Sequence, residues 1–141
     1  MEKECGIWIN VLSHKLKKCM NANVQSLGLT GVQSRVMHYI LVKYADGPVF
    51  QRDVENVFGF SRSTATGILQ LMEKNGLIQR ESVASDARLK SLIPTEKAAQ
   101  LHIQVEEYLR RTEQRLTHGL SSTQVTLFLE TIAHMSENLD R

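Results

Sequence analysis

Two helical segments joined by a tight turn, within residues 51–76, constrain the fold of this chain more than any other feature. The first segment covers about 51–57, Gly59 suits the turn, and Ser61 is a favourable N-cap for a second helix that ends near Asn75. The second helix has an apolar face (Ala65, Ile68, Leu69 and Met72) and a small, polar face (Arg62, Ser63, Thr66, Gly67 and Gln70). The pattern predicts two helices on a common core, the second with its polar face exposed.

The residues that follow predict a small β-hairpin. Leu77 and Ile78 are apolar, a polar stretch covers 79–88, and a second strand at 89–93 ends before Pro94. We therefore expect two strands joined by a long tip. A helix-turn-helix pair followed by such a hairpin is a winged helix-turn-helix, in which the hairpin is the wing.

Longer amphipathic helices are predicted on both sides of this unit. Apolar residues recur at helical spacing over 5–26. Thr30 and Gln33 form a capping box that opens a second helix. Thr95 opens a long helix after the hairpin, and Ser121 caps the last one.

The predicted fold class is mainly α with a small β-hairpin. We expect a single domain over 1–141, in which 29–94 is the winged helix-turn-helix part. The helices of 1–28 and 95–141 carry more apolar surface than one small winged unit can cover, and such surface normally marks an interface. These two segments are therefore predicted to be dimerisation helices.

Composition supports one globular domain. The chain has 141 residues, of which 42% are hydrophobic, enough to form a core without disulfides. No apolar run approaches the roughly 20 residues that span a bilayer, and the first residues lack the pattern of a signal peptide. We expect a cytoplasmic protein without a membrane partner. Cys5 and Cys19 lie about 21 Å apart along one helix, so both are predicted to be free thiols.

The charges are unevenly distributed, although the net charge is only +2. Residues 61–90 hold five Lys and Arg against three Asp and Glu, whereas residues 91–141 hold five against seven. A basic middle beside an acidic C-terminal third is consistent with one surface that faces a polyanion. Ordinary solvated faces explain the same counts equally well.

The polar face of the second motif helix has side chains suited to DNA. In a helix-turn-helix this helix enters the major groove, where Arg62 can bind guanine O6 and N7 and Gln70 can pair with adenine. Ser63 and Thr66 can reach phosphates or bases, and the helix N-terminus favours a phosphate. The alternative is a Ser/Thr-rich helix start that merely caps itself.

The hairpin carries a second candidate DNA contact in the stretch 85–90, Ser-Asp-Ala-Arg-Leu-Lys. Asp86 and Arg88 point the same way on an extended segment, so the carboxylate can hold the guanidinium in one rotamer. An arginine fixed in this way can enter a narrow, A·T-rich minor groove, and Lys90 lies two residues further on. Without other evidence, an Asp-x-Arg on a hairpin is usually a surface ion pair.

Taken together, these features resemble the MarR family of transcriptional regulators over nearly the whole chain. The matching residues are Leu29-Thr30 through Gln33, Ser61, Thr64, Gly-Leu-Ile at 76–78, Asp86-x-Arg88 and Thr95-Glu96-Lys97. The resemblance implies an obligate homodimer whose terminal helices interlock while two winged parts bind a pseudo-palindromic operator on double-stranded DNA. It places four side chains at the major groove: Arg62, Ser63, Thr64 and Thr66. It places Arg88 in the minor groove, oriented by Asp86.

The chain departs from the family pattern at three positions. Gly67 and Ala87 stand where the family often has arginine, which removes two positive charges from the predicted DNA-binding surface. Glu55 stands where a small residue commonly packs between the motif helices.

Metal, cofactor and catalytic sites are not expected. Among the five histidines, His102 has Glu106 at the i, i+4 spacing of a helical metal pair, but a metal site needs three or four converging ligands. The sequence has no nucleophile elbow, no P-loop and no His-Glu-x-x-His motif. We therefore expect neither an enzyme nor a cofactor.

Two regulatory hypotheses arise. His14, His38 and Tyr39 are candidates to line a cleft between the first, second and fifth helices and to bind a small aromatic effector, although each is equally consistent with ordinary packing. Cys5 resembles the early cysteine of peroxide-sensing members of the family, but Gly31 replaces the tyrosine that lowers the thiol pKa in them. Cys19 is expected in the core.

The function predicted from sequence is a sequence-specific, DNA-binding transcriptional regulator, more often a repressor in this family, that acts as a homodimer and responds to a small ligand or oxidant. A competing class is a winged-helix module that binds protein without specific DNA binding, with which the low net charge and Gly67 are also consistent.

Overall fold

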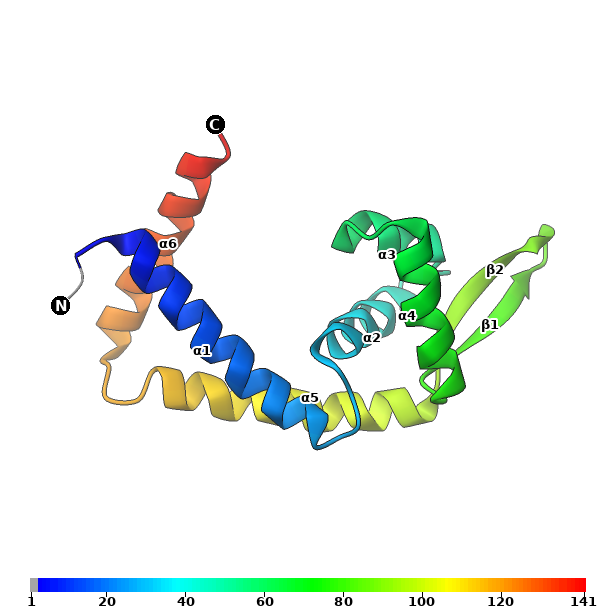
Figure 1. Cartoon of the computed structure of the whole chain (residues 1–141), viewed down its shortest axis with the longest axis horizontal. Coiled ribbons are helices and arrows are strands. Elements are labelled where there is room, and N and C mark those ends of the chain that lie inside the picture. The colour runs from blue at the N-terminus through cyan, green and yellow to red at the C-terminus, as the bar shows by residue number, and fades with distance from the viewer. Residues whose placement is uncertain (1–2) are drawn as a thin grey trace.

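The computed structural model describes residues 3–141 and has the mainly helical fold that the sequence predicts (Figure 1). Its elements, in chain order, are α1 (Cys5–Gln25), α2 (Gly31–Tyr44), α3 (Gln51–Phe58), α4 (Arg62–Lys74), β1 (Ile78–Val83), β2 (Asp86–Pro94), α5 (Glu96–Leu116) and α6 (Ser122–Leu139). Over these residues, no helix combines the length and the hydropathy needed to cross a lipid bilayer.

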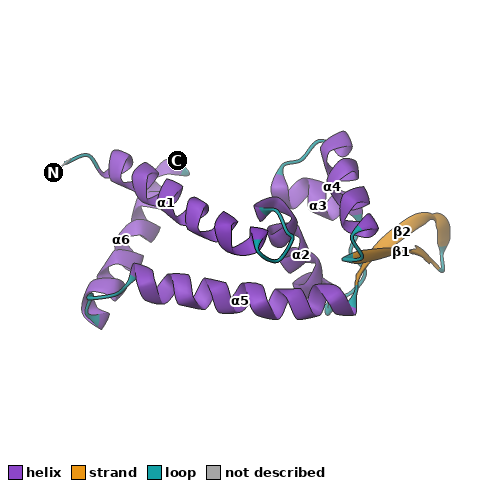
Figure 2. Ribbon diagram, turned by 60° about the horizontal axis from the view of Figure 1, so that its bottom comes forward, coloured by secondary structure: helices purple, strands orange, loops and turns teal. Residues whose placement is uncertain are grey.

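The molecule is elongated, with different elements at its two ends. Helices α2, α3 and α4 gather with the hairpin at one end, whereas α6 and the start of α1 lie at the other (Figure 1). Helix α5 connects the two ends, and α1 runs beside it over part of its length (Figure 2). The hairpin and α6 are therefore far apart, and α1 and α5 run between the two ends and contact α2.

Four predicted helix starts are confirmed by side-chain caps. Thr30 Oγ1 accepts the Gln33 N–H at 3.0 Å, while Gln33 Oε1 accepts the Thr30 N–H at 3.1 Å, which completes the predicted capping box. Ser61, Thr95 and Ser121 each accept a backbone N–H three residues further on. Each cap fixes where a helix begins, because it satisfies a donor that has no partner within the helix.

The core lies in the winged part. It combines α2, α3, α4 and the base of the hairpin with buried residues of α1 and α5. Its most buried large side chains include Met37, Ile40, Leu69, Met72, Leu77, Ile78 and Leu92. The backbone of β2 joins this core to the α2–α3 connection, because the Leu92 N–H donates to the Val49 carbonyl at 2.7 Å. Helix α4 and the wing are therefore anchored on one packed unit.

The prediction of a long hairpin tip is wrong. The strands pair in regular antiparallel register from Ile78 opposite Pro94 to Ser82 opposite Lys90. The register then shifts, Val83 pairs with Asp86, and a short turn is left. The polar stretch belongs to the strands because backbone N–H and C=O groups pair regardless of side-chain polarity, and both faces of this part of the hairpin are largely exposed. The wing is thus a regular two-stranded ribbon up to Ser82 and Lys90, with an irregularity before its turn.

The terminal helices leave a large apolar surface uncovered. No residue of α6 is buried, and Val24 is the buried residue of α1. The exposed large hydrophobic side chains of α1, α6 and the turn before α6 are Ile7, Trp8, Ile9, Val11, Leu12, Leu120, Leu127, Phe128, Leu129 and Leu139. A helix of this length normally gains most of its stability by packing an apolar face, so α6 has the properties of a helix that needs a partner surface.

Candidate nucleic-acid interface

Helix α4 presents the polar face that the sequence predicts. Ala65, Leu69 and Met72 are fully buried, which fixes the rotation of the helix on the core. The predicted DNA-facing side chains of α4 are on the opposite side, where Arg62, Ser63, Thr64 and Gln70 are exposed and Thr66 is half-buried. No atom would meet a Cβ added at Gly67, so this position leaves open space on the helix surface.

A groove runs between α3, α4 and the wing, and it is rich in positive charge. It collects five of the predicted DNA-binding residues: Arg62, Thr66, Gln70, Arg88 and Lys90. It also contains Gln51, Arg52 and Arg80, which sequence reasoning did not select. Its basic side chains outnumber its acidic ones by five to two, as expected of a surface that binds a polyanion.

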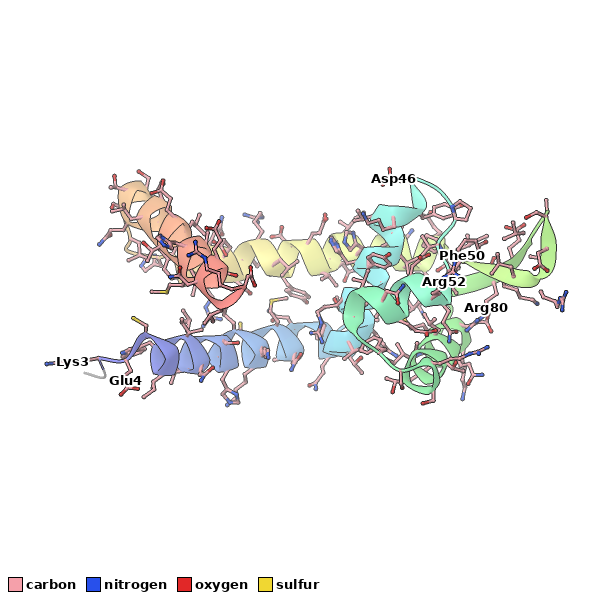
Figure 3. The ribbon with its side chains drawn as sticks, turned by 90° about the horizontal axis from the view of Figure 1, so that it is seen from above. Lys3, Glu4, Asp46, Phe50, Arg52 and Arg80 are labelled. Carbon is pink, nitrogen blue, oxygen red and sulfur yellow. The ribbon has the colours of Figure 1, made fainter. Side chains whose placement is uncertain are left out.

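The two additional arginines come from different elements. Arg52 is on α3 and Arg80 is on β1, and both lie at the hairpin end of the molecule (Figure 3). Arg80 Nε lies 3.5 Å from a carboxylate oxygen of Glu73, so an ion pair joins the wing to α4. Arg52 lines the same groove as Arg80, so both arginines extend the basic surface beyond the predicted residues.

The wing arginine is held less tightly than the sequence predicts. Arg88 Nε lies 4.0 Å from Asp86 Oδ1, and the Arg88 side chain is 97% exposed. The same carboxylate oxygen accepts the Arg88 backbone N–H at 2.9 Å. Asp86 therefore orders the backbone of the turn, and Arg88 extends freely from it rather than being held in one rotamer by a close ion pair.

A hydrogen-bond network joins the two motif helices. Gln51 Nε2 donates to Thr66 Oγ1 at 2.9 Å and lies 3.4 Å from the Arg62 carbonyl oxygen. Thr66 Oγ1 donates to the same carbonyl at 2.8 Å. The contact depends on the packing of α3 against α4, so no sequence signal at Gln51 alone indicates it.

A second cavity lies between α1, α2 and α5, with Phe58 of α3 at its edge. It has a volume of about 570 Å³ and mostly apolar walls, with the cations of Lys17 and Arg35 among its lining side chains. His38 and Tyr39 line it as predicted. The prediction for His14 is wrong, since its side chain is exposed on α1 outside the cavity lining.

The Tyr39 hydroxyl is a neutral hydrogen-bonding group. Burial, with a further contribution from the Asp53 carboxylate, raises the pKa of Tyr39 above its ordinary value of 10.0. The ring packs edge-on against Phe58 with a centroid distance of 5.9 Å. Tyr39 therefore connects the cavity with α3, and its phenol stays protonated at neutral pH.

The histidines of α2 and α5 form a direct contact. His38 Nδ1 and His102 Nε2 are 2.7 Å apart, and His102 Nε2 lies 3.7 Å from Glu106 Oε1. Residues 3–141 contain no group of three or more His, Cys, Asp or Glu side chains arranged to hold a metal ion. The two histidines thus form a hydrogen bond between α2 and α5.

Both cysteines are free thiols, as predicted. Cys5 is exposed at the first position of α1. The prediction that Cys19 belongs to the core is wrong, because its side chain is only partly buried between α1 and α5, where Arg115 Nη1 lies 3.7 Å from the sulfur.

The chain is similar to known regulators in sequence and in structure. The MarR family model matches residues 27–89. The transcription regulator MarR from Oenococcus oeni PSU-1 is 28% identical with a TM-score of 0.69, over 95% of this chain and 99% of that one. A putative MarR family transcriptional regulator from Clostridium acetobutylicum is 25% identical with a TM-score of 0.73, over 94% of this chain and 96% of that one. The S. aureus MepR–DNA complex shares the fold, at 21% identity and a TM-score of 0.82 over 97% of this chain and 99% of that one.

The exposed α4, the turn before it and the antiparallel hairpin after it define a winged helix-turn-helix protein. The family match covers α2, α3, α4 and most of the hairpin, and the structural likeness extends over the terminal helices. Residues 27–89 therefore match the MarR family of transcriptional regulators, and the chain as a whole is similar in structure to regulators of that family.

Proposed function

We propose that this protein is a sequence-specific DNA-binding regulator, most simply a repressor, that binds a pseudo-palindromic operator as a homodimer. The observation that carries the proposal is the arginine-rich groove that α4 shares with the wing. Arg62 and Gln70 would meet base edges in the major groove, with Ser63, Thr64 and Thr66 beside them. Arg88 would enter the adjacent minor groove, with Asp86 ordering the turn and Lys90 near a phosphate.

The homodimer is proposed from the uncovered apolar surface of α1 and α6. A second copy of the chain is the occupant that fits best. The apolar surfaces of α1 and α6 are at the same end of the molecule, so they can pack against the same surfaces of another copy around a two-fold axis. Such a dimer would place two copies of α4 about 34–36 Å apart, the spacing of successive major grooves on one side of DNA. Two half-sites in inverted orientation would then be bound together.

A binding experiment separates this function from that of a protein-interaction module. The protein is expected to enrich a palindromic sequence from a random duplex pool, and its affinity for that duplex should fall steeply between 50 and 200 mM salt, because bound cations are released from the phosphates (about 10³-fold or more for six phosphate contacts). A protein-interaction module would enrich no sequence and would bind duplexes weakly at both salt concentrations.

Arg62 and Arg88 are expected to contribute to DNA binding in different ways. Arg62→Ala should weaken binding to the selected operator by about 1–3 kcal/mol and relax the preference at one position of each half-site. Arg88→Ala should weaken binding and reduce the preference for A·T-rich flanking sequence. Quantitative binding to the operator and to single-base variants measures both effects. If both variants bound the operator as tightly as the parent, the assignment of this face to DNA would be wrong.

We further propose that a small aromatic effector or an oxidant releases the operator. The cavity between α1, α2 and α5 has the size and apolar lining of a ligand site, and Lys17 and Arg35 provide positive charge for an acidic ligand. Because its lining includes Phe58 of α3 and Leu16 of α1, an occupant would contact the winged part and a terminal helix together. A tenfold loss of DNA affinity needs about 1.4 kcal/mol of differential ligand binding. The exposed Cys5 is the candidate for the oxidant route.

An operator-release assay tests both routes. A panel of phenolic acids is expected to release the operator from the parent and from His14→Asn, which alters a histidine outside the cavity. His38→Asn should require about three- to tenfold more ligand, the effect of losing one hydrogen bond. Release by an organic peroxide that Cys5→Ser abolishes would assign the response to the thiol. Absence of release by either reagent would exclude both routes.

That the protein has no catalytic activity stays a prediction.

A further inference from the structure

Gln51 is the first residue of α3, and its amide reaches across the turn to α4. It shares the basic groove with Arg62, Thr66 and Gln70, and its side chain is half-buried there. No sequence pattern around Gln51 indicates a role for it. Its hydrogen bonds, however, determine whether the neighbouring Thr66 hydroxyl can donate or accept a hydrogen bond with a ligand in the groove.

The geometry fixes the orientation of the Gln51 amide. The Arg62 carbonyl oxygen can only accept hydrogen bonds, and it lies 3.4 Å from the atom at the end of the Gln51 side chain. That atom must therefore be the NH₂ group, since a second carbonyl oxygen there would be repelled. The same NH₂ group donates to Thr66 Oγ1 at 2.9 Å.

This arrangement also fixes the Thr66 hydroxyl. Its proton is donated to the Arg62 carbonyl at 2.8 Å, and one of its two lone pairs accepts from Gln51. One lone pair is left, so Thr66 can act toward a ligand only as an acceptor. Within residues 3–141 the Gln51 Oε1 atom accepts no hydrogen bond, so the second polar atom available here is an acceptor as well.

We propose that Gln51 is a specificity-determining residue, which with Thr66 forms an acceptor-only pair that selects an exocyclic amino group in the DNA major groove. The proposal rests on the proposed DNA-binding function. Adenine N6 and cytosine N4 are the amino donors of the major groove, whereas guanine O6 and thymine O4 are acceptors. Each base pair carries one such amino group in the major groove. The two acceptors of Gln51 and Thr66 therefore distinguish which strand carries it.

Without Gln51 the selection is lost. In the parent, rotating the Thr66 hydroxyl toward a base breaks both its bond to the Arg62 carbonyl and the bond that it accepts from Gln51. Without Gln51 only the bond to the carbonyl is lost, so the hydroxyl can accept or donate according to the base that it meets. When a fixed acceptor faces guanine O6 or thymine O4, two buried acceptors lie opposite each other without a proton between them, which disfavours binding. A hydroxyl that can rotate is compatible with all four bases. Gln51 thus acts partly through Thr66 and partly through its own Oε1.

The test is a selection experiment on randomised half-sites with the full-length parent, Gln51→Met and Thr66→Val. Methionine keeps the unbranched shape of glutamine without its hydrogen bonds, and valine keeps the shape of threonine without its hydroxyl. The parent should prefer adenine or cytosine on one strand at one position. Each variant should lose about three- to tenfold of that preference, at the same position, which corresponds to one hydrogen bond. The double variant should lose less than the sum of the two losses.

Gln70→Met is the matched control, because it makes the same chemical change on the same surface. It should relax a different position of the half-site. Thermal unfolding distinguishes a purely structural role from a role in specificity. A variant that only loosens the packing of α3 against α4 should lower the stability and the affinity for all sequences, without changing the base preference at one position. An unchanged preference in Gln51→Met, or a parental preference for guanine or thymine at the affected position, would overturn the proposal. A parent that enriches no sequence would instead overturn the proposed function.

Discussion

Replacing Leu129 with aspartate is expected to convert the protein to a monomer at micromolar concentration and to lower its affinity for a palindromic operator by about 100-fold or more. Leu129 is 57% exposed on α6, a helix with no buried residue. In a two-fold dimer the substitution places two carboxylates in an apolar interface, and each costs several kcal/mol to desolvate. A monomer would then bind one half-site and lose the gain of about 10²–10⁴-fold that linked sites provide.

Val57→Asp is the matched control for the oligomeric state. Val57 is also 57% exposed, but it lies on α3 in the winged part, away from α6 (Figure 1). Sedimentation should find this variant associated like the parent, and Leu129→Asp monomeric but folded by circular dichroism. A parent that is itself a stable monomer at micromolar concentration would disprove the proposed dimer.

Leu69→Ala is expected to destabilise the protein by about 2–5 kcal/mol, the usual cost of emptying a filled core position. Leu69 is fully buried on α4, directly beneath the face proposed to meet DNA. The loss is a large share of the 5–15 kcal/mol by which a domain of this size is typically stable. Urea unfolding at a fixed protein concentration measures it, because self-association would otherwise contribute to the apparent stability.

Leu71→Ala provides the comparison on the same helix. Leu71 is 47% exposed, so the same truncation removes little buried surface and should cost about 0.5 kcal/mol or less. Equal losses in the two variants would show that the rotation of α4 on the core differs from that described above.

Helix positions could be predicted from sequence because their signals are local. Thr30, Ser61, Thr95 and Ser121 each cap a helix through a backbone group three residues away, a relation that sequence spacing contains directly. The hairpin tip could not be predicted in this way. Pairing within residues 79–88 depends on the opposite strand, and polar side chains on two exposed faces give no alternation of apolar residues to indicate it.

The candidate site was predictable where one helix carries it. The polar face of α4 follows from helical periodicity, so Arg62 and Gln70 are placed correctly from spacing alone. Gln51 and Arg80 enter the groove through the packing of α3 and β1 around α4, which no local pattern shows. For the same reason His14 was misassigned: its place on α1 is predicted by periodicity, but which side of α1 faces the cavity is set by α2 and α5.

The continuity of α5 has a mechanical consequence. Its 21 residues form one uninterrupted rod that is about 31 Å long at 1.5 Å per residue. If the end next to α6 is held by a partner, a tilt of only about 5° moves the end next to the wing by about 2.7 Å, close to the roughly 3.4 Å between successive base pairs. A small rotation at one end is thus enough to put the wing out of register with its groove, without any change in the internal packing of the winged part.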